Sequence, residues 1–365
     1  MKVINPILWK PFLVTAFIVS FFSCNSSKNS QVKEFEDLAG TVIAPDTGYY
    51  DCFRPFILGD KFVSRNINGD FSIYAGIFEG DILRTGTNFA RKGQGPMEFG
   101  DVYMAQGSDS SLYVMNGNGG HPISIVRIPF HPWPKDGMED WTEYRLDSLD
   151  FMTCQSWVVL SDSTALLNSA KFNSNSIFSV LDFKNAKLTE MLWLPEDNKT
   201  FENSIVKQGI YTDNSFLFRH SEENGDDRFL YTCGSGAYSM IFKLTNGGIE
   251  IIKVLSEVYP DYWEAEDGLN YYVRRNTSEL IAATSSKRIF LLEIDRDENG
   301  KTAEDRIGPS RGDIVHVYDW NGNFIKDYKL DRLVLYIFAS PSDNKLYAMY
   351  ENHDTGEQDI IRYDL

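Results

Sequence analysis

Short apolar runs separated by turn-forming residues recur along most of this chain. Each copy has an apolar run, then a small residue with Asp or Ser, then a second run rich in Val, Ile, Leu, Phe and Tyr. Gly, Ser and Asp favour tight turns, and the flanking runs are typical of strands. The copies are Phe56–Ser64, Ala105–Met115, Val158–Asn168, Gly209–Phe218, Ala282–Ile294 and Phe338–Tyr350. The pattern therefore predicts six hairpins.

A second hairpin follows in several copies, most clearly in Ile314–Leu330. There Asn321-Gly322 stands between two alternating strands and predicts a type I′ turn. Two hairpins make a four-stranded antiparallel sheet, and a period of roughly 50 residues per sheet is typical of propeller blades. After the signal, apolar residues do not recur with the 3.6-residue period of a helix over any long stretch. We expect one short helix at most, in the insertion Ser256–Asn276. The predicted fold is an all-β, six-bladed β-propeller of four-stranded antiparallel blades.

The last copy supplies only three strands, and a spare strand stands ahead of the first copy. Gly40–Asp46 reads GTVIAPD, which fits a short strand. Paired as the outer strand of the last blade, it would close the ring and remove an open sheet edge. We therefore predict one propeller domain over residues 37–365, closed by an N-terminal strand.

The N-terminus has the pattern of a bacterial signal peptide. Lys2 and Lys10 are its only charges, and Pro11–Phe22 is an apolar run too short to span a bilayer comfortably. Ser23-Cys24, followed by a polar stretch, resembles a lipobox. This resemblance implies a lipid on Cys24.

We therefore expect a signal peptide over residues 1–23, a flexible tether over 24–36 and anchoring in the outer membrane of the cell envelope, with its side undetermined. The alternative is ordinary secretion, with Cys24 inside the signal.

The net charge and the cysteine spacing limit the classes of ligand and partner that we expect. The net charge of −17 repels phosphate backbones, so we expect no nucleic acid and no nucleotide cofactor as a partner. Cys52, Cys154 and Cys233 lack metal-ligand spacing. Free thiols and one disulfide both remain open for them.

One loop carries a family resemblance. Gly93-Gln94-Gly95-Pro96-Met97-Glu98-Phe99 and the turn Trp320–Phe324 are similar to segments of the TolB-like six-bladed propeller lipoproteins of Bacteroidota. The resemblance covers roughly Phe35–Leu365 and implies a propeller in the cell envelope. It implies no catalytic residue. In the loop itself we expect the glycines to give backbone freedom and Phe99 to pack between sheets.

Candidate chemistry is sparse. Asp295, Asp297 and Asn299 match the first half of a calcium loop, but Arg306 stands where the bidentate Glu belongs. A calcium site and a solvated hairpin tip are the two interpretations, and no other cofactor is expected. The five histidines are scattered, and no GxSxG is present, so no catalytic residue is assigned.

Binding is expected on the loop face of the propeller, where loops between second and third strands and between blades open together. The candidate binding residues are Arg91, Lys92, His220, Trp263, Tyr272, Arg274 and Arg275. The alternative is that the loops are solvated tips and the aromatic rings pack on neighbouring blades. We expect a non-enzymatic envelope protein that binds a glycan, peptide or protein partner. The alternative function is a hydrolase or lyase acting on a polysaccharide.

Overall fold

The computed structural model describes residues 34–45, 52–66, 69–95, 97–107, 111–118, 121–130, 140–146, 149, 153–171, 174–197, 204–222, 225–265, 271–273, 279–294, 311–352 and 357–365. The chain divides into two units, Met1–Glu34 and Phe35–Leu365. All described strands and the helix belong to the second unit. No helix among the described residues is long and apolar enough to cross a membrane.

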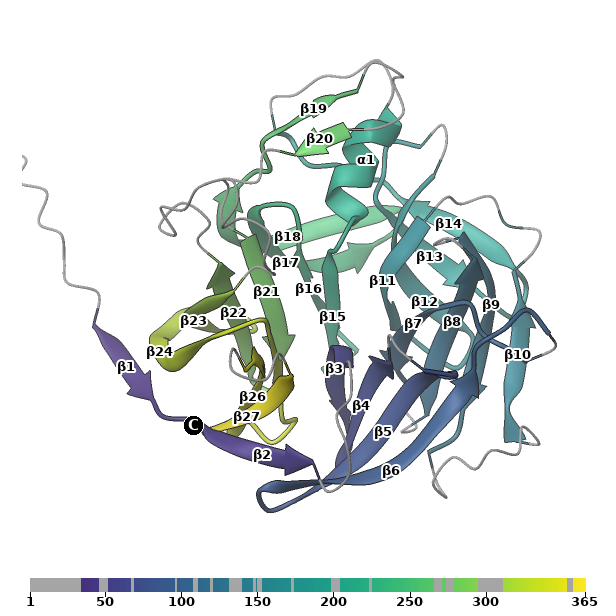
Figure 1. The fold of residues 1–365 in the computed structure, drawn as a ribbon. Coiled ribbons are helices and arrows are strands. Elements are labelled where there is room, and N and C mark those ends of the chain that lie inside the picture. The colour runs from purple at the N-terminus through teal and green to yellow at the C-terminus, as the bar shows by residue number, and fades with distance from the viewer. Residues whose placement is uncertain are drawn as a thin grey trace, which may run out of the picture. The chain divides into compact units, whose positions relative to one another are not determined.

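Six four-stranded antiparallel blades make up the second unit (Figure 1). Blade one comprises β3 (Cys52–Leu58), β4 (Lys61–Asn66), β5 (Phe71–Glu79) and β6 (Ile82–Arg91). Blade two comprises β7 (Asp101–Gln106), β8 (Leu112–Asn118), β9 (His121–Ile128) and β10 (Thr142–Arg145). Blade three comprises β11 (Thr153–Val159), β12 (Thr164–Ala170), β13 (Phe178–Asp182) and β14 (Lys187–Met191).

The later blades repeat this order. Blade four comprises β15 (Phe216–His220), β16 (Arg228–Thr232), β17 (Ala237–Thr245) and β18 (Gly248–Val258). Blade five comprises β21 (Glu279–Thr284), β22 (Arg288–Ile294), β23 (Gly312–Asp319) and β24 (Phe324–Val334). Blade six comprises β25 (Tyr336–Ala339), β26 (Lys345–Glu351), β27 (Gln358–Asp364) and β2 (Thr41–Pro45). The first strands of all six blades line one central cavity, so the predicted propeller is confirmed.

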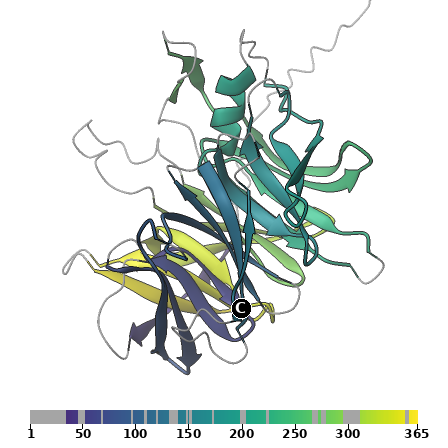
Figure 2. The ribbon, with the colours of Figure 1, turned by 90° about the vertical axis from the view of Figure 1, so that its right-hand side faces the viewer.

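The core lies between the blades, because each sheet buries both faces against its neighbours. Phe290 of blade five and Leu346 of blade six, for example, share one buried cluster. Figure 2 shows the same sheets turned by 90° about the vertical axis of Figure 1. The cavity wall is thus held by a continuous ring of packed sheets.

The N-terminal strand closes the ring as predicted. Thr41–Ile43 pairs antiparallel with β27 of blade six. Ala44 and Pro45 then pair in parallel with the start of β6 in blade one. β2 therefore joins the last blade to the first through backbone hydrogen bonds on both sides.

An additional N-terminal strand was not expected. β1 (Phe35–Leu38) pairs in parallel with β24 and is the fifth strand of the blade five sheet. It includes Phe35 and Glu36, the last two residues of the stretch expected to be a tether. Between β1 and β2, the Gly40 N–H donates to Asp331, and a Cβ at Gly40 would lie 2.2 Å from Ile361. Only glycine fits this crossing.

Blade four differs from the prediction in one hairpin and in the position of the helix. Gly209–Phe218 is not a hairpin, because α1 (Ser204–Thr212) ends inside it and β15 begins only at Phe216. The insertion Ser256–Asn276 contains a hairpin of β19 (Tyr262–Glu264) and β20 (Tyr271–Val273) instead of a helix in its described part. The connection between the first two strands of blade four therefore falls at residues 221–227.

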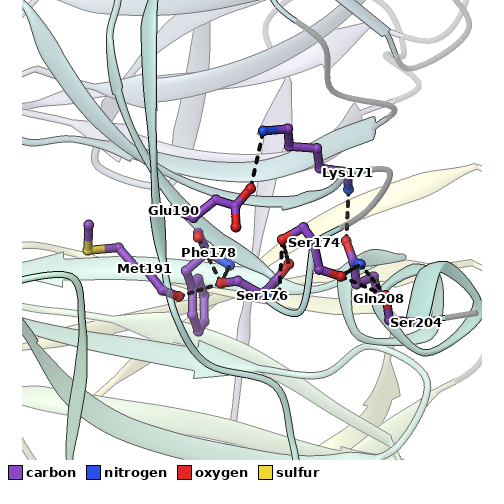
Figure 3. Close-up of polar contacts among 8 residues, drawn as sticks. All are labelled: Lys171, Ser174, Ser176, Phe178, Glu190, Met191, Ser204 and Gln208. Carbon is purple, nitrogen blue, oxygen red and sulfur yellow. Dashed lines mark hydrogen bonds and ion pairs between the residues drawn. The ribbon is translucent and has the colours of Figure 1, made fainter.

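Contacts with residues far from the helix in the sequence stabilise α1. The Lys171 N–H donates to Gln208 Oε1 at 2.8 Å, and Gln208 Nε2 donates to the Ser174 carbonyl at 2.6 Å (Figure 3). Ile205 and Ile210 of the helix are buried in the same cluster as strands of blades three and four. A nine-residue helix is marginal alone, so these tertiary contacts decide its conformation.

The turn at Asn321-Gly322 also differs from the prediction. Among these two residues only Gly322 has a positive φ, whereas type I′ requires both. The Asp319 carboxylate accepts the N–H groups of Asn321 and Asn323. Capping by this carboxylate therefore replaces the type I′ geometry.

Replacing Ile43 with Ala should lower the free energy of unfolding by about 2–5 kcal/mol. The Ile43 side chain is 1% exposed and packs in a cluster shared by blades six and one. Val42, its neighbour in β2, is 45% exposed, so Val42→Ala should change the free energy by less than about 0.5 kcal/mol. Chemical denaturation followed by circular dichroism measures both. Equal losses would contradict a closing role for the buried face of β2.

Candidate functional site

The candidate site is the axial cavity, which has a volume of about 530 Å³. Its wall consists of the first strands of the six blades and is mostly apolar. Because these strands run in the same direction, the cavity has two distinct ends. We call the end where they begin the loop end, since the loops between second and third strands lie there. The other end, where the first turns lie, is the hairpin end.

Arg54 lies in the wall near the loop end. The pairing of β3 with β4 shifts register between Phe53 and Phe56, and Arg54 has a φ of 49°. This is a β-bulge with a non-glycine residue in the left-handed region, a conformation that costs about 1–3 kcal/mol. The Arg54 guanidinium lies 5.0 Å from the centroid of the Phe216 ring and 5.7 Å from that of Phe53.

A second arginine approaches the same ring. The Arg65 guanidinium lies 6.0 Å from the Phe53 centroid and 5.8 Å from the Tyr103 centroid. One of its nitrogens lies 3.4 Å from an Asp101 carboxylate oxygen. Burial lowers the pKa of Arg54, and the charge of Arg65 lowers it further, while Asp213 opposes this change. The two guanidinium groups thus repel each other beside a shared aromatic ring.

Three arginines line the described part of the cavity. The described residues that line the cavity include Arg54, Arg65 and Arg219 but no Asp or Glu. Arg219 is occupied by structural bonds, since it donates to Asp227 and to the Val159 carbonyl. An entering group therefore meets two aromatic-flanked cations at the loop end.

His220, a predicted binding residue, lies at the hairpin end, contrary to the prediction for the loop face. The error follows from the misplaced first turn of blade four. His220 lies four residues after Phe216 in β15, which corresponds to about 13 Å of extended strand. Its ring stacks on Trp320 at 4.8 Å, and Nε2 lies 3.3 Å from Glu222. These contacts give it a packing role.

Arg91 and Lys92 lie at the end of β6. Arg91 is exposed, whereas Lys92 is half-buried and its N–H donates to the Asp70 carbonyl. Burial lowers the pKa of Lys92, and the nearby charge of Arg65 adds to this decrease. The charge of Lys92 thus interacts with that of Arg65 in the cavity wall.

The glycine-rich loop that follows is structural. The Gly95 N–H donates to Glu98 Oε2 at 2.8 Å. A Cβ at Gly93 or Gly95 would lie 2.0 or 2.9 Å from that same oxygen. Phe99 is buried and packs on Trp141 with centroids 6.0 Å apart. Both glycines are needed because the Glu98 carboxylate occupies the loop, which leaves no cradle for a phosphate.

Trp263 and Tyr272 form an exposed aromatic pair on the β19–β20 hairpin. They are cross-strand partners with centroids 5.6 Å apart, and they are 47% and 56% exposed. Tyr262, on the other face, is buried and donates to Asp197 at 2.7 Å. Asp197 also accepts from Lys207 at 2.6 Å. The buried face anchors the hairpin and presents the aromatic pair outward.

The remaining predicted sites lie outside the described residues. These are Cys24, Arg274, Arg275, Asp295, Asp297 and Asn299. The part of the chain that the structure describes contains no group of three or more His, Cys, Asp or Glu residues able to hold a metal ion. Cys154 and Cys233 are buried free thiols, and burial raises the pKa of both.

Known proteins offer a likeness of fold only. No protein family model matches the chain, and no curated protein matches it. A Bacteroides thetaiotaomicron protein of unknown function is 10% identical, with a TM-score of 0.46 over 89% of this chain and 75% of that chain. The RRP9 WD40 repeats are 11% identical, with a TM-score of 0.44 over 91% of this chain and 100% of that one. BamB from Moraxella catarrhalis is 12% identical, with a TM-score of 0.33 over 85% of this chain and 71% of that one.

A half-buried histidine in blade five faces two carboxylates. His316 Nδ1 lies 2.6 Å from Asp327 Oδ1, and Nε2 lies 3.0 Å from Glu293 Oε2. Burial lowers the pKa of His316, but hydrogen bonds to Glu293 and Asp327 outweigh burial and raise it above the ordinary 6.5. The imidazolium, which donates from both nitrogens, is thus the favoured form.

The stability of the protein should therefore fall as pH rises above neutrality. Because the folded pKa of His316 exceeds the unfolded value, its contribution is complete below about pH 6.5 and is lost as pH rises through the folded pKa. Urea midpoints measured from pH 5.5 to 9 should decline for the wild type and decline less for His316→Gln. Parallel curves would show that this cluster contributes nothing to the pH dependence.

Proposed function

We propose that this protein is a non-enzymatic binding protein of the cell envelope, which receives a peptide segment of a partner protein at the loop end of its axial cavity. The observation that carries the proposal is the cavity itself. Its volume of about 530 Å³ falls within the range of about 300–1,000 Å³ typical of ligand sites. An apolar wall with a few fixed polar groups is also typical of such sites.

A peptide fits this wall better than a neutral glycan does. Sugars present many hydroxyl groups that must be hydrogen-bonded when they are buried. The wall near the loop end offers Phe53, Tyr103, Phe216 and Tyr336, together with the two arginines. Aromatic rings and guanidinium groups suit apolar and acidic peptide side chains.

The geometry favours binding over polysaccharide cleavage. Glycoside hydrolysis usually needs two carboxyl groups on either side of the bond, and the described part of the cavity wall has no Asp or Glu. His220 is at the hairpin end, away from Tyr103 and Arg54 at the loop end. The wall therefore offers cations and rings without a general acid and base pair.

The location in the envelope rests on the sequence. The charge and length of residues 1–23 suit a signal peptide, and Ser23-Cys24 suits lipid attachment. We propose that Cys24 carries the anchor and that residues after it tether the propeller to the outer membrane.

A selection of random heptapeptides displayed on phage tests the binding site. Val158 is half-buried and lines the cavity, so Val158→Trp should fill part of it. Peptides selected on the mature protein should bind this variant about tenfold or more weakly. They should bind Trp263→Ala, whose substitution lies on the exposed hairpin, as they bind the wild type.

Thermal unfolding of both variants checks that the propeller remains folded. The reverse pattern, with binding lost in Trp263→Ala and kept in Val158→Trp, would contradict the proposal. It would place the binding surface on the β19–β20 hairpin.

A further inference from the structure

The Arg54 side chain reaches across the axis of the propeller. Arg54 belongs to β3 of blade one, and its guanidinium lies 5.0 Å from the ring centroid of Phe216, the first residue of β15 in blade four. Each blade shares a buried cluster with the next one in sequence, and blade six shares one with blade one. Blade four is therefore opposite blade one in the ring, and this contact spans the cavity between them.

The β-bulge in β3 aims this side chain at the axis. Beyond the bulge, the side chains of β3 alternate between the neighbouring blades, since Leu58 packs toward blade two and Ile57 toward blade six. At the bulge, the pairing with β4 shifts register after Phe53, and Arg54 has a φ of 49°. Bulges redirect side chains, and a non-glycine residue in the left-handed region is strained. Such strain is often found at ligand clamps and switch regions.

Aromatic side chains of four blades surround the guanidinium at the loop end. The Phe53 ring of blade one lies 5.7 Å from it, and the Tyr336 ring of blade six contacts Phe53 with centroids 5.6 Å apart. Tyr103 of blade two and Phe216 of blade four also line this part of the cavity. The cavity continues past these rings to residues at the hairpin end. Arg54 thus lies across the loop end, ahead of most of the cavity volume.

We propose that Arg54 is a gate across the loop end of the cavity, closed while its guanidinium lies against Phe216 and open when the side chain turns away from blade four. This inference rests on the proposed function and names how access to its site is controlled. The contacts that hold the gate closed include the cation–π contact with Phe216 and the attraction of Asp213.

Opening of such a gate needs no change in the sheets. Cation–π contacts are modest in strength, and a side chain changes its rotamer far faster than strands separate. A ligand that enters from the loop end meets only the open fraction of the molecules, which lowers its apparent rate of association and its apparent affinity. Removal of the gate should therefore speed entry.

Labelling of a cysteine inside the cavity tests the gate without a peptide. Met104 follows Tyr103 in β7, is half-buried and lines the cavity, so Met104→Cys places a thiol past the gate. A biotin maleimide without charge should label this thiol about fivefold or more faster when Arg54→Ala is added. A neutral reagent is neither attracted nor repelled by the guanidinium. Equal labelling rates with and without Arg54 would overturn the proposal.

Two controls separate opening of the gate from loosening of the fold. Arg54→Ala alone should not change the labelling of Cys154 and Cys233, which are buried between blades. Arg145 lies on the outer strand of blade two with an exposed side chain, so Arg145→Ala should not change the labelling of Met104→Cys. An equal increase at the buried native cysteines would overturn the gate, because it would show that the whole fold had loosened.

Phe216→Leu tests the same contact from the opposite blade. This variant removes the aromatic face and keeps an apolar side chain, so it should speed the labelling of Met104→Cys by less than Arg54→Ala does. It tests the proposal where Arg54→Ala fails to fold, which thermal unfolding reveals. Unchanged labelling in a folded Phe216→Leu variant would contradict a gate that closes on this ring.

Peptide binding then distinguishes failure of the gate from failure of the proposed function. The peptides selected on the mature protein should associate with Arg54→Ala about fivefold or more faster and dissociate at the rate found for the wild type, as surface plasmon resonance measures. Unchanged association with faster dissociation would make Arg54 a ligand contact, which overturns the gate and keeps the cavity as the site. Faster labelling of Met104→Cys without any selected peptide would support the gate and contradict the proposed function.

Discussion

Closure of the ring by β2 is the constraint on which the cavity depends. β2 pairs with β27 on one side and with β6 on the other, so it brings blade six against blade one. Across this junction the Phe53 ring of β3 meets the Tyr336 ring of β25, with centroids 5.6 Å apart. An open ring would separate these strands and expose their edges. The wall that holds Arg54 therefore exists only because an N-terminal strand completes the last blade.

This arrangement links the N-terminal segment to three blades. β1 and β2 together cover the outer edges of blades five and six, and the end of β2 reaches blade one. Asp331 of β24 accepts a hydrogen bond from the Gly40 N–H, which lies between β1 and β2. It also accepts one from the Tyr363 hydroxyl of β27. β1 and β2 thus join blades five, six and one through the N-terminal segment.

Much of the fold was predictable, because hairpin turns and alternating strands are local features. Five of the six predicted hairpins and the closing strand are present, as the pairing of β3 with β4 and of β2 with β27 illustrates. Blade four was misread because Gly209–Phe218 has the same composition as a hairpin. Gln208 resolves the ambiguity through bonds to Lys171 and Ser174, more than thirty residues away. No local pattern reveals such contacts.

The site was harder to predict than the fold, and the reason lies in β3. Arg54 lies in a run whose pattern is that of an ordinary strand, and nothing in that pattern indicates a functional role. One clue was present, since Pro55 interrupts that run and proline within a strand often marks a bulge. The convergence of Arg54 with Arg65 and Phe216 depends on the pairing of β3 with β4 and on the distant blade four. The spacing of residues in the sequence shows neither the strand pairing nor the contact with blade four.

The net charge of −17 opposes the approach of an anion from afar, yet it does not decide binding inside the cavity. At physiological ionic strength exposed charges are screened beyond about 8 Å, whereas buried groups are screened much less. Distant surface carboxylates therefore act weakly at the loop end, where Asp101 lies 3.4 Å from Arg65 and Asp213 opposes the decrease in the pKa of Arg54. Long-range repulsion would mainly slow the association of acidic ligands, while these close contacts would govern their dissociation. The net charge of the whole chain and the charges beside the cavity thus act over different distances.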